Sequence, residues 1–249
     1  TRITPFSSDS GPSLPAAADD SAVIALGERI DPQTGRIVEG FKIIDYKPGY
    51  GKSANARKPG GGGTTCYAFL ANGARWKGTE NYLVDPTNSR GLDGTVVNGL
   101  LAQAADGWDN QVAFEVFGNE VQGAVDAASI GNSMNGRNEF AFGDSGSPGA
   151  IAVTVVWGVF YGPPSGRELV ECDMLFDDGD FDWSAEASGV AGKMDFLNIA
   201  AHEVGHAAGM GHPSNTCTNE TMYAYADYGE TIKRDLNTGD VLGIKALYK

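Results

Sequence analysis

All three histidines of this 249-residue chain lie between positions 202 and 212, in the segment HEVGHAAGMGH. His202 and His206 are four residues apart, so on a helix their rings lie on one face and can share an ion. Gly209 can end that helix in a sharp turn, because glycine adopts positive φ without a Cβ penalty, and the turn brings His212 round as a third ligand. Three neutral imidazoles with a vacant fourth position are typical of a catalytic zinc site.

Glu203 follows the first histidine and is predicted to face the vacant position, where it can take a proton from water. A bare HExxH also occurs on surface helices with two solvated histidines. The extra glycine and third histidine at fixed spacing, with no histidine elsewhere in the chain, disfavour that alternative. We therefore predict His202, His206 and His212 as zinc ligands and Glu203 as the catalytic general base.

The elements that must position these residues follow from the apolar patterns. Alternating and β-branched runs predict strands, and apolar residues at helical spacing predict helices, one of them with Asp93 as its N-cap. Strands are expected at 36–38, 41–44, 66–76, 82–84, 112–116, 150–161 and 169–176, and helices at 93–108, 195–208 and 237–248. This order of elements indicates an α+β fold. The Gly- and Lys-rich stretch 47–65 indicates a linker or an exposed loop.

Met222 follows the third histidine within Glu220-Thr221-Met222-Tyr223, and with it the chain resembles the metzincin metallopeptidases, whose HExxHxxGxxH signature precedes a methionine turn. Within that clan the chain is most similar to the matrixins, particularly the compact bacterial and archaeal ones. The similarity is carried by residues 73–76, the helix ending at Trp108, and residues 171–176, 194–198 and 240–248. It covers the chain from about residue 66 to its C-terminus.

This resemblance implies a twisted mixed β-sheet with a long first helix, an active-site helix and a C-terminal helix. It divides the chain into an N-terminal extension, 1–65, and a matrixin-like catalytic domain, 66–249, with Met222 as an apolar floor under the ligands. It also implies a secreted, monomeric zinc endopeptidase that cleaves proteins or peptides, with one catalytic zinc and no structural zinc. Glu203 would take a proton from the attacking water and pass it to the leaving amine.

The resemblance leaves the substrate cleft less defined. An extended peptide can pair with an exposed edge strand, for which the segment 182–190 is the candidate. Tyr225 either lines the pocket beside the zinc or packs as an ordinary core residue.

Two alternatives to an active endopeptidase remain. One is a zinc-binding recognition protein without hydrolytic activity, against which the intact Glu203 argues. The other is a latent precursor in which residues 1–65 fill the cleft and an aspartate from this arm takes the fourth zinc position.

The cysteines and one acidic loop have two or more interpretations each. The matrixin resemblance makes a Cys172–Cys217 disulfide conceivable, whereas the alternative is three free thiols. A further alternative is that Cys66 binds the zinc as a latency thiolate, although the PRCGxPD switch motif of the family is missing. The four carboxylates of Asp177, Asp178, Asp180 and Asp182 fit either a calcium site or a solvated acidic loop, and the resemblance favours calcium.

Composition excludes several other functions. The segment 143–148, GDSGSP, is similar to a serine-peptidase nucleophile loop, but that chemistry needs a histidine that precedes the serine, and none does. The formal charge of -14 predicts that nucleic acid and anionic membranes are poor partners. No run of apolar residues is long enough to span a bilayer. The first residues lack a signal-peptide pattern, which fits a cytoplasmic protein or a secreted one whose signal has been removed.

Overall fold

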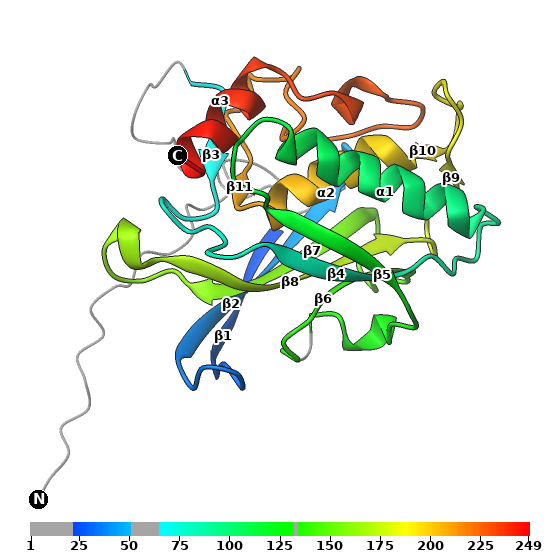
Figure 1. Ribbon diagram of the computed structural model, residues 1–249. Helices are drawn as coiled ribbons and strands as arrows, with labels where there is room; N and C mark the ends of the chain where they lie inside the picture. Colours follow the sequence, from blue (N-terminus) through cyan, green and yellow to red (C-terminus); the bar gives the residue numbers. More distant parts are fainter. Residues whose placement is uncertain (1–21, 51–64, 132–133) are drawn as a thin grey trace, which may run out of the picture.

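The computed structural model describes residues 22–50, 65–131 and 134–249, and a seven-stranded twisted sheet forms its centre (Figure 1). The strand order is β1-β2-β7-β8-β6-β4-β5. Strands β4, β5, β6 and β8 run parallel, while β7 is antiparallel to β8, and β2 is antiparallel to both β7 and β1. The strands comprise Ala22–Ile30 (β1), Ile37–Tyr46 (β2), Glu80–Asp85 (β4), Phe117–Gln122 (β5), Asn138–Gly143 (β6), Ala150–Val159 (β7) and Glu168–Asp177 (β8).

Three helices lie on one side of this sheet: α1 (Gly94–Asp109), α2 (Phe196–Ala207) and α3 (Thr238–Leu247). Each begins after a polar cap, and the predicted cap Asp93 accepts hydrogen bonds from the first-turn amides of Thr95 and Val96. A large apolar core fills the space between the helices and the sheet, and a smaller one lies on the opposite face. Strand β7 is buried along its whole length because both cores contact it. The predicted α+β fold and its three helices are confirmed.

Short elements connect these layers. Two-residue strands β3 (Ala68–Phe69) and β11 (Met210–Gly211) pair antiparallel, and β9 (Trp183–Ser184) and β10 (Met194–Asp195) pair parallel. Three 3-10 turns complete the structure, namely η1 (Ala127–Ser129), η2 (Pro164–Gly166) and η3 (Ile232–Arg234). The β3–β11 pair matters most for the site, because β11 directly precedes His212.

Two sequence-based expectations for strands were wrong. The predicted strand at 112–116 is a loop, because the Asp109 side chain accepts hydrogen bonds from the amides of Val116 and Phe117 and so holds this segment against the end of α1. Of the predicted strand at 66–76, only Ala68–Phe69 forms a strand, β3. Strand β6 was not predicted at all. The two strands predicted at 36–38 and 41–44 are one strand, β2, which pairs with β1 and β7 in the main sheet.

The disulfide also differs from expectation. Cys66 bonds to Cys217, while Cys172 is a free, buried thiol on β8. Cys172 is buried in the core between the sheet and the helices. The expected Cys172–Cys217 pairing is therefore wrong. The proposed Cys66 thiolate latch is wrong as well, because the Cys66 sulfur is already bonded. The observed bridge ties the start of the segment before β3 to the loop that follows His212.

We predict one free thiol per chain, and none that reacts before unfolding, because burial raises the pKa of Cys172 well above its usual value. A thiol reagent added to the native and to the denatured protein measures this count.

The bridge joins residues 151 positions apart, so Cys217→Ser should lower the free energy of unfolding by about 2–5 kcal/mol. Ser214→Ala in the same loop is the control and should change little. Recovery of a Cys172–Cys217 peptide from the unreduced protein would contradict the pairing.

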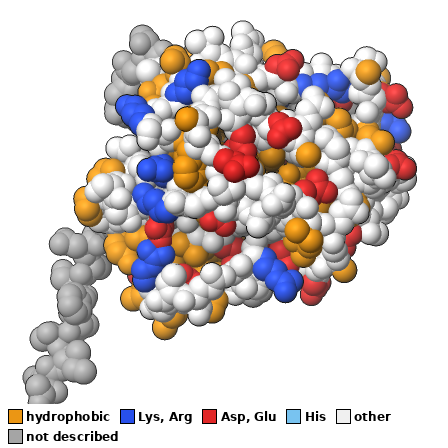
Figure 2. Space-filling view, viewed as in Figure 1, with side chains coloured by type: hydrophobic (Ala, Val, Ile, Leu, Met, Phe, Trp, Pro, Cys, Tyr) orange, Lys and Arg blue, Asp and Glu red, His pale blue; other side chains and the backbone are white. Residues whose placement is uncertain are grey.

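The surface carries charges of both signs. On the face shown in Figure 2, acidic and basic side chains are interspersed, with several basic groups along one side. The net charge of -14 is therefore not gathered into a single acidic patch on this face. Among the described residues, no helix is both long and apolar enough to cross a membrane.

Candidate active site

Helix α2 brings the first two predicted ligands together. The helix starts after Asp195, whose carboxylate accepts a hydrogen bond of 2.9 Å from the amide of Asn198. His202 and His206 follow one turn apart and are almost fully buried. The Nε2 atom of each ring lies 3.0 Å from Nε2 of His212. The three histidines therefore converge through the same ring nitrogen, as the sequence predicts.

The turn at Gly209 delivers His212 to this point. Gly209 has φ +97°, a conformation that favours glycine, and a Cβ there would lie 2.8 Å from the carbonyl oxygen of Ala74. The amide of Leu70 donates to the carbonyl of Gly209 at 3.0 Å, and β3 then pairs with β11. The Cys66–Cys217 disulfide holds the chain on the other side of His212. The third ligand is thus fixed before and after its own position.

The opposite ring nitrogens of two histidines are bonded to backbone. Nδ1 of His202 donates to the carbonyl of Thr221 at 2.6 Å, and Nδ1 of His206 donates to the carbonyl of Met210 at 2.8 Å. Because a carbonyl can only accept, the protons lie on Nδ1 and the Nε2 lone pairs face the common centre. Burial lowers the pKa of His202 to about 3 and also lowers that of His212. Both rings are therefore neutral at neutral pH, as metal binding requires.

The methionine turn supports this arrangement from below. Asp240 of α3 accepts hydrogen bonds from the amides of Thr221 and Met222, at 2.7 and 3.2 Å. Met222 is fully buried against α2 at Gly205, where a Cβ would collide with its sulfur. The close approach therefore requires glycine at position 205. The predicted apolar floor is present, and Asp240 is a supporting residue that sequence reasoning missed.

Glu203 is fully buried beside the histidines. Its Oε2 accepts a hydrogen bond of 2.6 Å from the hydroxyl of Thr154 on β7, and its Oε1 has no hydrogen-bond partner among the described residues. Burial, reinforced by the nearby Asp45 carboxylate, raises the pKa of Glu203 well above its usual value. The sequence did not identify Thr154. Its only signal was a hydroxyl within the apolar run AIAVTVVW.

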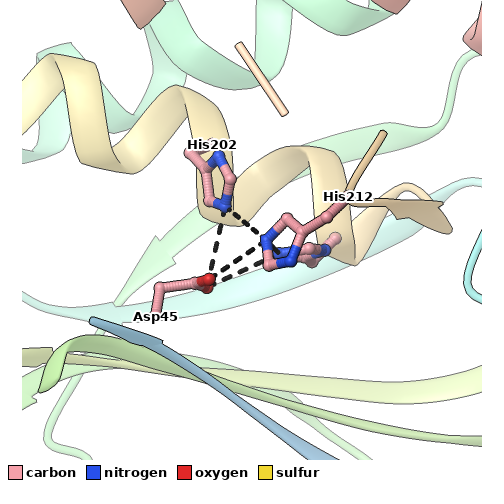
Figure 3. A group of neighbouring side chains, drawn as sticks. Asp45, His202 and His212 are labelled. Carbon is pink, nitrogen blue, oxygen red and sulfur yellow. Dashed lines mark hydrogen bonds and ion pairs between the residues drawn. The ribbon is translucent and has the colours of Figure 1, made fainter. Parts of the chain in front are cut away.

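A fourth side chain, Asp45 of β2, faces the three histidines (Figure 3). Its Oδ1 lies 3.0 Å from Nε2 of His212, and its Oδ2 lies 3.5 Å from Nε2 of His206 and 3.7 Å from that of His202. The carboxylate is buried, and neither oxygen has a hydrogen-bond partner in the described part of the chain. An unpaired buried carboxylate is costly, which points to a cation at this place.

These four residues form the one group of converging metal-ligating side chains within residues 22–50, 65–131 and 134–249. Their imidazole nitrogens and carboxylate oxygen match the four-coordinate donor sets that proteins use for zinc. The orphaned oxygens of Asp45 and the outward Nδ1 hydrogen bonds also fit a metal. The residues present are therefore suited to hold zinc.

Asp45 reaches this position because β2 pairs with the outer side of β7. Ile43 of β2 lies opposite Thr154, and the amide of Lys47 donates to the carbonyl of Gly149 at 3.0 Å just beyond the strand. Side chains alternate along β2, so Ile43 packs in the helix-facing core and Ile44 in the core on the other side. Asp45, two residues after Ile43, shares the helix-facing side.

The sheet topology differs from the prediction that the segment 182–190 is the peptide-binding edge. In the segment 182–190, Trp183–Ser184 pairs with β10 in a separate two-stranded sheet, so this segment is not an edge of the main sheet. The strand of the main sheet that borders the active site is β7, and β2 covers its outer side. The edge position beside the histidines is therefore taken by the chain itself.

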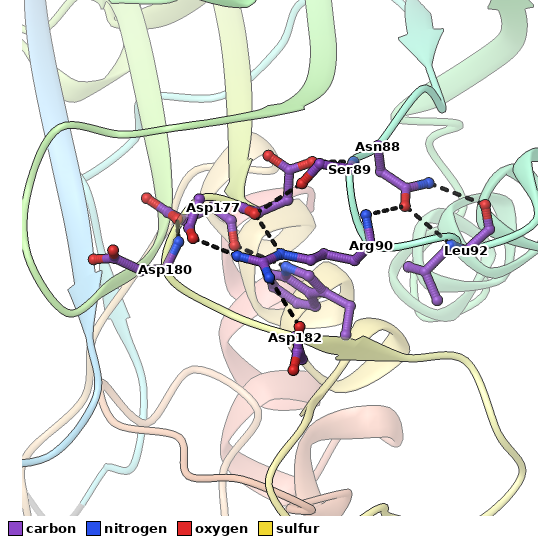
Figure 4. Close-up of polar contacts among 10 residues, drawn as sticks. Asn88, Ser89, Arg90, Leu92, Asp177, Asp180 and Asp182 are labelled. Atoms are coloured by element: carbon purple, nitrogen blue, oxygen red, sulfur yellow. Dashed lines mark hydrogen bonds and ion pairs between the residues drawn. The ribbon is translucent and has the colours of Figure 1, made fainter.

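The acidic loop 177–182 forms hydrogen bonds with two neighbouring segments, residues 89–90 and residues 145–149 (Figure 4). Arg90 donates to Asp182 at 3.0 Å and to the carbonyl of Asp178 at 2.6 Å. The Asp177 carboxylate accepts hydrogen bonds from the amides of Ser145 and Asp180, at 2.9 and 2.7 Å. The Asp178 and Asp180 carboxylates likewise accept backbone amides, from Ser89 and Gly149. These hydrogen bonds give the carboxylates a structural role, and calcium binding stays a prediction.

A narrow pocket opens beside the histidines. Its lining includes Asp45, His202, Glu203, Tyr225 and Lys233. Of the two interpretations of Tyr225, the structure has the one in which the side chain lines this pocket.

Comparison with known proteins identifies related sequences. The family model described as Matrixin matches residues 81–249, which include Glu203 and the three histidines but not Asp45. Karilysin of Tannerella forsythia is 37% identical over 89 residues, which is 36% of this chain and 16% of that protein. Stromelysin-1 of Equus caballus is 40% identical over 77 residues, or 30% of this chain and 15% of that protein. Matrilysin of Homo sapiens is 28% identical over 185 residues, or 73% of this chain and 61% of that protein. The aligned part of the chain thus spans less than two thirds of each relative.

Proposed function

The chain belongs to the matrixin family, and from this premise we propose that it is a zinc-dependent endopeptidase that its own N-terminal arm holds latent. The convergence of the three Nε2 atoms with the Asp45 carboxylate carries this proposal. The substrates are proteins or peptides. The arm corresponds to residues 1–65 and the catalytic domain to residues 66–249.

His202, His206 and His212 would hold the zinc, and Glu203 would handle the proton. When bound, zinc supplies Lewis acidity, which lowers the pKa of water toward about 7 and polarises a carbonyl. Glu203 accepts the proton of the attacking water and delivers it to the leaving amine. The Thr154 hydroxyl fixes one oxygen of Glu203, so the other oxygen, which has no partner among the described residues, is free for this task.

Asp45 makes the arm inhibitory in two ways. Its carboxylate lies where a catalytic zinc site must leave room for water and substrate. The strand that carries it also covers the outer side of β7, where an extended peptide would add to the sheet. A salt bridge of 3.2 Å between Lys47 and Asp227 fastens the chain on the far side of the cleft. The same arm therefore blocks both the metal and the substrate-binding edge.

A zinc-binding recognition protein without hydrolytic activity is the weaker alternative. Such a protein does not need a general base, yet Glu203 is intact, buried and held by Thr154. Burying an ionisable carboxyl group that performs no task is unfavourable. The preserved geometry around Glu203 therefore supports hydrolysis.

Two further attributes belong to this proposal. The protein is secreted, which the Cys66–Cys217 disulfide supports, because such bonds persist in oxidising compartments. The acidic loop binds calcium, which its four carboxylates and the family resemblance support. A rise of the melting temperature on addition of calcium to the zinc-loaded protein would support that part, and an unchanged melting temperature would count against it.

We predict that Asp45→Ala in the full, zinc-loaded chain raises peptide hydrolysis about tenfold or more over wild type. The substitution frees the fourth zinc position and removes the contact that anchors the end of β2, so the competent fraction rises. Casein and quenched peptides provide the assay. Glu28→Ala removes the same charge from the exposed edge of the same hairpin and serves as the control. Equal rates for wild type, Asp45→Ala and a chain trimmed of its arm would disprove latency.

We also predict that Glu203→Ala, introduced into the Asp45→Ala chain, keeps one zinc per chain but lowers kcat by about 100-fold to 10,000-fold. Zinc is retained because Glu203 is not among the converging ligands. Metal analysis and steady-state kinetics measure the two effects. Glu115→Ala, an exposed glutamate, is the matched control, and a chelator should abolish the activity of every variant. Undiminished cleavage by the Glu203 variant would refute the proposed mechanism.

A further inference from the structure

The pocket beside the histidines contains a buried cation that the reaction itself does not use. Lys233 of η3 lines this pocket together with His202 and Glu203. The lysine is 1% exposed, which makes it one of the most buried polar side chains of the described chain. Lysine is rarely buried to this degree unless a partner compensates its charge.

The compensation for Lys233 is incomplete. Its Nζ donates to the carbonyl of Tyr223 and lies 5.1 Å from the centre of that ring. The charges of four carboxylates, Glu230, Asp45, Asp240 and Glu203, act on Lys233, but none of them forms an ion pair with Nζ among the described residues. An ammonium has three donors, so this one has hydrogen-bonding capacity left for an anion. A buried charge without a close counter-ion is unfavourable, which makes a ligand carboxylate a strong partner.

The backbone of Lys233 is fixed relative to the zinc ligands. Its amide donates to the side chain of Asn198 on α2 at 2.7 Å, and its carbonyl accepts from the hydroxyl of Thr221 at 3.2 Å. Thr221 in turn accepts the Nδ1 hydrogen of His202 through its own carbonyl. The backbone of Lys233 is therefore tied to α2 and to the turn that carries Thr221.

The direction of β2 indicates which part of a substrate enters this pocket. After Asp45 the chain continues to Lys47, which lies beside Asp227 and Tyr228. The segment from Tyr223 to Ala226 forms part of the wall of the pocket. A peptide that replaces β2 in the same direction therefore places the residue after the scissile bond against this wall. Asp45 lies at the same border of the pocket, so its negative charge departs when the arm leaves.

We propose that Lys233 determines specificity by binding the carboxylate of an aspartate or glutamate that directly follows the scissile bond. This inference rests on the proposed endopeptidase function and on the displacement of the arm. The Asp45 carboxylate partly neutralises Lys233 in the latent chain, and an acidic substrate side chain takes over that role in the active one. The lysine thus favours both the docked arm and an acidic substrate.

The test compares peptides that differ only at the residue after the cut. The full, zinc-loaded Asp45→Ala chain is assayed with quenched peptides carrying glutamate or the isosteric, neutral glutamine at that residue. We expect kcat/KM to favour glutamate by about tenfold to a hundredfold, because a charged hydrogen bond is lost with glutamine. Lys233→Met should abolish this ratio, whereas Lys245→Met, the same change on the exposed side of α3, should retain it. An unchanged ratio in the Lys233 variant would overturn the inference.

A second measurement keeps the inference independent of catalysis. Calorimetry compares the affinities of the dipeptides Glu-Gly and Gln-Gly, which mimic the amine product, for the same zinc-loaded chain. Tighter binding of Glu-Gly that depends on Lys233 supports the inference, and equal affinities reject it. Absence of hydrolysis of every peptide would count against the endopeptidase function, while calorimetry would still decide on Lys233. Lys233→Arg retains the charge and should retain part of the preference if the methionine variant fails to fold.

Discussion

A buried carboxylate that faces three imidazole nitrogens is the interaction on which this structure depends. Without a cation this arrangement is unfavourable, because burial lowers the pKa of His202 and His212 and keeps both rings neutral, and the Asp45 oxygens lack hydrogen-bond donors among the described residues. A metal ion turns this unfavourable arrangement into a four-ligand site. The strand pairing that brings Asp45 to the histidines is then part of the same site, which is the basis for the proposal that the arm is inhibitory.

The remaining structure keeps the ligands where the metal needs them. The Nδ1 hydrogen bonds to the carbonyls of Thr221 and Met210 fix two rings, and the disulfide and the β3–β11 pair hold the third. Asp240 supports the turn that carries Thr221. Lys233 is attached to the same turn, so the residue proposed to select substrates is positioned by the groups that position the metal. The same hydrogen bonds therefore position both the metal site and the proposed specificity pocket.

The sequence predicted the parts of the site that are local. His202, Glu203 and His206 share one helix turn, and Gly209 and His212 follow directly, so periodicity and turn chemistry sufficed. The N-cap Asp93 followed from the same local rules. Asp45 and Thr154 were missed because they reach the site only through the pairing of β2 with β7, a long-range contact that no local pattern encodes. The disulfide was mispaired for the same reason, because the distance between two cysteines depends on the tertiary structure. The sequence offered an aspartate of the arm at the fourth zinc position only as one alternative, and nothing in the arm distinguished Asp45 from its other aspartates.

The central claim is that Asp45 occupies the fourth position of a zinc site in the full chain. A crystal structure of the zinc-loaded, full-length protein, with anomalous data collected at the zinc edge, tests it directly. The account predicts one anomalous peak within about 2.0–2.2 Å of the three Nε2 atoms and of an Asp45 oxygen, with β2 still paired to β7. A zinc ion that binds water in place of Asp45, with the arm detached from β7, would contradict it.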